Sequence, residues 1–145
     1  MTAPSVHDSF VCSFYHHLED RTLTILSHYR DHDIQEPYLT TEFTNVVAHH
    51  FQHVVAPSIL FDIEETDVQT ILSMNKELFK NGLNYNWPFH GPRTLAEVAH
   101  RLTSESINGY QIMGSCGLDG FVLASTCSIN ASATPHAQSN AALDT

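Results

Sequence analysis

Residues 110–124, which read YQIMGSCGLDGFVLA, decide the expected fold. Two apolar runs, 110–113 and 121–124, flank a segment that contains three glycines, and this arrangement predicts a β-hairpin. The pair Asp119-Gly120 is a favoured turn pair at the start of the second run. Helix-like segments that precede a hairpin favour an α+β fold over an alternating α/β fold.

Two of the preceding segments have the spacing of amphipathic helices. In 5–20 an apolar residue recurs every four positions, and the residues concerned are Val6, Phe10, Phe14 and Leu18. In 41–55 the apolar residues, together with His50, fall on one face of a helix. We therefore predict helices over both segments, despite the valines in the second.

Two further helices are predicted from their ends. Thr66 can cap a helix that Gly82 stops. Thr94 and Glu97 have the spacing of a capping box, which opens a helix that runs through Leu102.

The remaining segments complete the predicted architecture. Residues 22–29 and 58–63 are rich in β-formers and predict short strands, and 83–93 predicts a loop. We expect a single compact α+β domain over 1–129, with about four helices, short strands and a C-terminal β-hairpin. Residues 130–145 contain almost no large apolar side chain and predict a disordered tail.

The net charge and the cysteine content of the chain argue against some classes of function. The chain of 145 residues has a net charge of −10, which argues against binding to nucleic acid or to anionic membranes. No signal peptide or membrane-spanning run is evident, and the three cysteines, Cys12, Cys116 and Cys127, cannot all pair within the chain. These features predict a cytoplasmic protein with free thiols.

Two features could support a metal site or catalysis. His49 and His53 are four residues apart, so on a helix they would project from one side, as metal-ligating pairs do. Cys116 lies between glycines, and such a turn can expose a nucleophile. The alternative function is therefore a His- or Cys-dependent enzyme or a metal-binding domain. We assign no cofactor and no metal, because a third ligand is not evident and glycines also occur in ordinary hairpin turns.

The leading hypothesis is a non-enzymatic acidic module that binds a protein with a basic surface, of the inhibitor or immunity type. An acidic cluster lies between the second predicted strand and the third helix, and three aromatic residues gather in the 83–93 loop. The predicted partner-binding residues are Asp62, Glu64, Glu65, Asp67, Tyr85, Trp87 and Phe89. Two structural alternatives stay open: the carboxylates could serve the helix dipole, and the aromatics could form a lid over the core.

Overall fold

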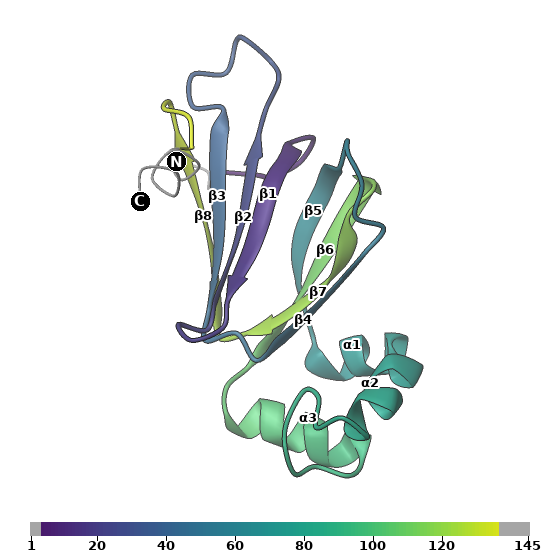
Figure 1. Ribbon diagram of the computed structural model, residues 1–145. Coiled ribbons are helices and arrows are strands. Elements are labelled where there is room, and N and C mark those ends of the chain that lie inside the picture. The colour runs from purple at the N-terminus through teal and green to yellow at the C-terminus, as the bar shows by residue number, and fades with distance from the viewer. Residues whose placement is uncertain (1–3, 137–145) are drawn as a thin grey trace, which may run out of the picture.

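A computed structural model describes residues 4–136, and within them the chain forms one antiparallel sheet and three helices (Figure 1). The strand order in the sheet is β4-β7-β6-β5-β1-β2-β3-β8. The strands are β1 (Phe10–His17), β2 (Thr22–His28), β3 (Tyr38–Thr44), β4 (Ala48–Gln52), β5 (Ile59–Thr66), β6 (Asn108–Cys116), β7 (Asp119–Ala124) and β8 (Thr126–Ser132). The helices, α1 (Val68–Met74), α2 (Lys76–Leu83) and α3 (Leu95–Ser104), all lie between β5 and β6 in the sequence.

The sheet consists of two halves that are weakly joined. Between β1 and β5, a single residue pair, Phe10 with Ile59, is in register. Figure 1 shows that the strands on either side of this junction diverge and face each other. We call β1, β2, β3 and β8 the β2 half-sheet, and β5, β6, β7 and β4 the β6 half-sheet.

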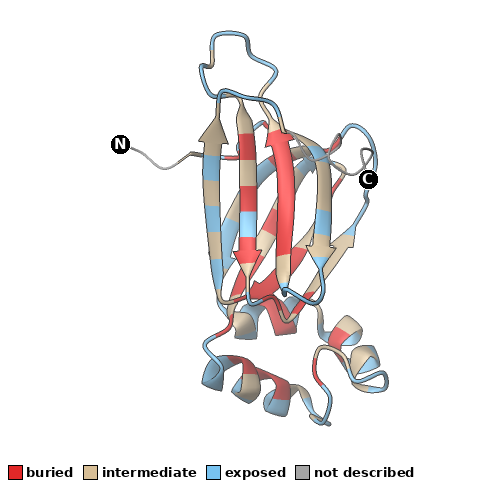
Figure 2. Cartoon of the chain, turned by 60° about the vertical axis from the view of Figure 1, so that its left-hand side comes forward, coloured by how far each residue is buried: buried red, intermediate tan, exposed pale blue. Residues whose placement is uncertain are grey.

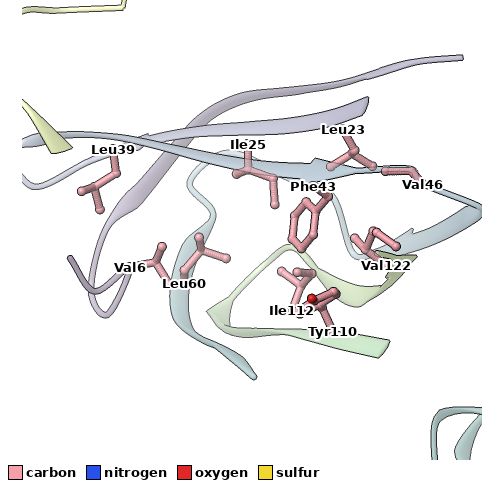
Figure 3. Close-up of a cluster of buried hydrophobic side chains, with 11 residues drawn as sticks. Val6, Leu23, Ile25, Leu39, Phe43, Val46, Leu60, Tyr110, Ile112 and Val122 are labelled. Carbon is pink, nitrogen blue, oxygen red and sulfur yellow. The ribbon is translucent and has the colours of Figure 1, made fainter. Parts of the chain in front are cut away.

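The main hydrophobic core lies between the inner faces of the two half-sheets (Figure 3). On the β2 half-sheet, alternate residues point inward because side chains in a strand alternate between its faces. Fully buried core residues from both half-sheets are Leu23, Ile25, Leu39, Phe43, Leu60, Ile112 and Val122. Figure 2 shows the resulting alternation along β3 and β8, whereas β2 is buried along most of its length.

A second core lies between the helices and the outer face of the β6 half-sheet. The ring of Phe79 on α2 stacks on Phe121 of β7 at 5.5 Å and on Trp87 at 5.0 Å, measured between ring centroids. Buried residues of α1 and α3, such as Ile71 and Val98, belong to the same cluster. The three helices therefore cover one end of this outer face, as Figure 1 shows.

The prediction of about four helices is wrong, because the chain is mostly sheet and the first two predicted helices are strands. Segment 5–20 contains β1, and segment 41–55 contains the end of β3 and all of β4. A spacing of four residues keeps side chains on one side of a strand as well as of a helix, so it did not discriminate between them. Both segments are rich in β-branched or aromatic residues, which pack well in a sheet.

In the C-terminal half of the chain, the structure agrees more closely with the prediction from the sequence. The predicted hairpin is β6 and β7, and α3 begins at the predicted capping box, where the Glu97 N–H donates to the Thr94 hydroxyl at 3.2 Å. The predicted helix 66–82 is interrupted at Asn75, which separates α1 from α2. The single compact domain is confirmed. Strand β8 extends to Ser132 and pairs with β3, while 137–145 of the predicted tail lie outside the described residues.

Candidate binding groove

The residues of the predicted acidic cluster do not share one face, because most of them lie on a strand, β5, whose side chains alternate between its two faces. Asp62, Glu64 and Glu65 are exposed on β5, and Asp67 caps α1 by accepting a hydrogen bond from the Gln69 N–H at 2.8 Å. Glu65 is in register with Tyr110, whose ring belongs to the core between the half-sheets. Glu65 therefore lies on the inner side of the strand, and Asp67 has a structural role as a helix cap.

The predicted aromatic residues of the 83–93 loop separate in the same way. Trp87 stacks on Phe79, and Phe89 is buried against the helices at 9% exposure. Only Tyr85 projects outward, with 83% of its surface exposed. The loop packs its aromatic side chains into the helical core and lies beside α3 (Figure 1).

Asp62 and Glu64 instead border a surface that crosses all four strands of the β6 half-sheet. Residues in direct register on neighbouring antiparallel strands share a face and lie side by side. Glu64 pairs with Gln111 of β6, Gln111 pairs with Phe121 of β7, and Phe121 pairs with His50 of β4. These four residues form the first cross-strand row.

A second row runs parallel to the first. Asp62 of β5 pairs with Met113 of β6, and Asp119 of β7 pairs with Gln52 of β4. Except for Asp62 and Glu64, the members of both rows line one cavity of about 310 Å³. The two rows are therefore the floor of a groove, and Asp62 and Glu64 lie on its β5 side.

The wall of the groove is the end of α1. Met74, at the last turn of that helix, is 62% exposed, and the amide Nε2 of Gln111 lies 3.4 Å from its sulfur. Asn75 also lines the cavity. Met74 and Asn75 therefore mark the edge of the helical cover at this groove.

Gly120 allows β4 to approach β7 beneath the groove. Its φ of +147° lies in a region that L side chains rarely adopt, and a Cβ at this position would clash with the carbonyl oxygen of His50. The close approach of the two strands therefore requires glycine here.

The groove is negatively charged. No lysine or arginine is among the described residues that line it, while Asp119 lies on its floor. One oxygen of Asp119, Oδ2, lies 3.5 Å from Nδ1 of His53. The other, Oδ1, is buried and has no hydrogen-bond partner among residues 4–136. A carboxylate oxygen without a donor is costly to bury, so Asp119 has unused capacity to accept a hydrogen bond.

The histidine and cysteine candidates do not come together. His53 lies after the end of β4 and contacts Asp119, whereas the Nδ1 of His49 lies 2.8 Å from Nδ1 of His16 on β1. Burial, with smaller contributions from His16 and His50, lowers the pKa of His49 to about 4. Within residues 4–136, no group of three or more His, Cys, Asp or Glu residues could hold a metal ion.

Cys116 is exposed at the β6–β7 turn, where its sulfur lies 3.6 Å from the carbonyl oxygen of Pro57. This contact orients the side chain and supplies no general base. Among residues 4–136, Cys116 forms no hydrogen bond with a histidine, so the geometry does not assemble a cysteine–histidine pair.

Sequence reasoning missed most of the groove, including Met74, Gln111, Met113 and Asp119. Alternation in the β6–β7 hairpin could have placed Gln111, Met113 and Asp119 on one face. Their alignment with β4 and β5 depends on strand pairing, which the hairpin alone does not determine.

The sequence matches no protein-family model and no curated protein. Among the helices of residues 4–136, none is long and apolar enough to cross a membrane.

Proposed function

We propose that this protein is a non-enzymatic binding module that holds a basic segment of a protein partner in the groove. The observation that carries the proposal is the pair of cross-strand rows, with carboxylates at Asp62, Glu64 and Asp119 and no lysine or arginine among the described lining residues. A lysine or arginine of the partner would supply the missing positive charge.

The apolar part of the groove suits a peptide rather than an isolated cation. Met74 and Met113 present flexible, polarizable side chains, which adapt to irregular apolar surfaces. The amides of Gln52 and Gln111 can donate to and accept from a peptide backbone. A segment with alternating basic and apolar residues would match this arrangement.

The charge of the whole chain supports the same type of partner. A net charge of −10 attracts a basic protein over a distance and raises its association rate at low salt. An inhibitor or immunity-type protein would use this attraction to block a basic enzyme. The proposed compartment is the cytoplasm, in keeping with three unpaired cysteines at Cys12, Cys116 and Cys127.

A basic peptide with alternating lysine and leucine tests the groove, and the same peptide with glutamate in place of lysine is the reference. We expect the basic peptide to shift the backbone amide signals of Gln111 and Asp119 and the methyl signal of Met113 in NMR spectra. The glutamate peptide should leave these signals unchanged. Shifts confined to residues outside the two rows would contradict the proposal.

Charge reversal separates the groove from the net charge. The double variant Asp62→Lys, Glu64→Lys should weaken binding of the basic peptide about tenfold at low salt, since each exposed charge contributes up to about 1 kcal/mol. The matched control is Asp33→Lys, Glu36→Lys in the exposed loop between β2 and β3, which changes the net charge equally, from −10 to −6. Equal losses in both variants would show that binding follows net charge and does not use the groove.

A further inference from the structure

A second cavity lies at the end of the two half-sheets where β1 turns into β2. The β1–β5 junction is at the opposite end of β1. The cavity has a volume of about 260 Å³ and is enclosed by the β1–β2 and β3–β4 turns, the 83–93 loop and the end of α3. The backbone N–H of Val46 donates to the carbonyl oxygen of Arg21 at 2.8 Å, which ties the two turns together. The cavity is thus framed by elements from distant parts of the sequence.

Positive charge gathers in this cavity although the chain is acidic. Only six lysines and arginines occur in the sequence, and two of them, Arg21 and Arg101, line this one cavity. Glu105 is the one acidic residue among the described lining residues. The cavity therefore differs in charge from the groove, which has no lysine or arginine among its described lining residues.

Arg101 is held in a fixed position. Its Nε donates to Glu105 at 2.8 Å, its Nη1 donates to the carbonyl oxygen of His90 at 3.1 Å, and its guanidinium lies 4.2 Å from the centre of the Phe89 ring. A guanidinium held on three sides loses little conformational freedom when an anion binds.

Arg21 is exposed, and its guanidinium has no partner among residues 4–136. It projects from a turn residue with a φ of +55°, next to the cavity that it lines. Its five N–H donors are therefore free for a ligand, and their fork geometry matches a carboxylate.

His16 adds a neutral donor at the same cavity. The Nδ1 atoms of His16 and His49 lie 2.8 Å apart, so one of them must donate and the other accept. When His49 donates, the proton of His16 resides on Nε2, which forms no hydrogen bond among the described residues. The histidine pair then leaves one N–H of His16 available to a bound anion.

Apolar side chains form the rest of the cavity. Val46 and Ile107 are each 4% exposed, and Phe89 and Pro88 close the side toward the loop. Ligand sites typically combine an apolar lining with a few convergent polar groups, and their volumes run from roughly 300 to 1,000 Å³. A cavity slightly below this range suits a ligand with few non-hydrogen atoms.

We propose that this cavity binds a small carboxylate with a short apolar tail. Arg21 and His16 would contact the carboxylate, and the tail would lie against Val46 and Ile107. Arg101, whose charge is offset by Glu105, would hold the Phe89 side of the cavity in place. The site is separate from the groove and requires no protein partner.

Hexanoate is the probe, followed by NMR of the full chain. We expect saturable shifts of the Arg21, Val46 and Ile107 amide signals and of the His16 ring signals. Arg21→Gln should raise the Kd for hexanoate at least tenfold, whereas Arg93→Gln, an exposed arginine outside the cavity, should leave it within twofold. Both variants change the net charge equally and replace exposed side chains, so folding should be preserved in each.

Two further ligands test the two halves of the proposal. 1-Hexanol should not produce the shifts at Arg21 and His16, because it lacks the charge. Inorganic phosphate should bind more weakly than hexanoate, because it lacks the tail. Equal affinity for phosphate and hexanoate, or a Kd for hexanoate that Arg21→Gln leaves unchanged, would overturn the assignment.

Discussion

The two half-sheets share an inner core but differ in what lies on their outer faces. The β6 half-sheet carries apolar residues outward, including Phe121, Leu123 and Ala48, and the helices cover them. The outward residues of β3 and β8 in the β2 half-sheet are polar, such as Glu42, Ser128 and Asn130, and no helix of residues 4–136 covers them (Figure 1). In this sheet the helices thus cover the outer face on which apolar residues gather.

The candidate groove lies at the border of this cover. Beyond Met74 the outer face of the β6 half-sheet changes from apolar to mixed, with Gln111, Met113 and Asp119 in place of buried aromatic and aliphatic residues. A fully polar face would need no partner, and a fully apolar face would need a helix. The mixed face is the part of the sheet that is suited to reversible binding.

Removing the centre of the helical cover should have the largest effect. Phe79 is fully buried and stacks on both Phe121 and Trp87, so Phe79→Ala should reduce the free energy of unfolding by about 3–5 kcal/mol. The measurement is urea denaturation followed by circular dichroism.

Tyr85→Ala is the control in the same loop region, because this side chain is 83% exposed and should change stability by at most about 0.5 kcal/mol. If Phe79→Ala instead showed two separate transitions, the helices would unfold independently of the sheet. The two half-sheets and the three helices would then not unfold as one cooperative unit.

The same contrast explains what the sequence could predict. In α3 and the β6–β7 hairpin, local signals agree with the final structure: the capping box at Thr94 opens the helix, and the glycine-rich turn joins the strands. These signals depend on contacts between residues that are close in sequence. They needed no knowledge of the rest of the fold.

The N-terminal half depends on distant pairing instead. β1, β2 and β3 pair in sequence order, but β3 also pairs with β8, and β4 pairs with β7, more than 60 residues away. Residues at a spacing of four, such as Phe10 and Phe14, satisfy both a helix and a strand, and only the pairing partners decide between them. The candidate groove was missed for the same reason, since its strands lie in the order β4-β7-β6-β5 in the sheet, which differs from their order in the sequence.

Acid should weaken the contact between the half-sheets at His16 and His49. The pKa of His49 is lowered to about 4 in the folded protein, against about 6.5 when unfolded, so the unfolded chain binds an additional proton as the pH falls. The stabilisation is complete above pH 6.5 and is lost as the pH falls from there toward 4. Because His49 is only half-buried, we expect a loss of about 1–2 kcal/mol between pH 7.5 and pH 5.

Chemical denaturation at a series of pH values measures this loss. His49→Phe should flatten the dependence between pH 7.5 and pH 5, while His7→Phe, at an exposed position, should retain it. A dependence of the same size in His49→Phe would show that the proton uptake occurs at other groups. The meeting point of the half-sheets would then not be the acid-sensitive part of the fold.

The smallest expected effect is a gain in stability on the inner face of the β2 half-sheet. Thr41 is fully buried between Ile25 and Ile129 on the neighbouring strands, and its hydroxyl has no hydrogen-bond partner among residues 4–136. Thr41→Val keeps the shape of the side chain and removes the unpaired oxygen, which should stabilise the protein by about 1 kcal/mol.

Ser27→Ala provides the opposite case, because the Ser27 hydroxyl is buried and accepts a hydrogen bond from Ser9 at 3.1 Å, so its loss should destabilise the protein. Opposite signs for the two variants in thermal denaturation would show that the core between the half-sheets tolerates a polar group only where it is paired. If Thr41→Val lost stability as Ser27→Ala does, the Thr41 hydroxyl would have a partner in solution, such as a buried water molecule. The inner core would then contain a paired polar group at Thr41, and its difference from the mixed surface of the groove would be smaller.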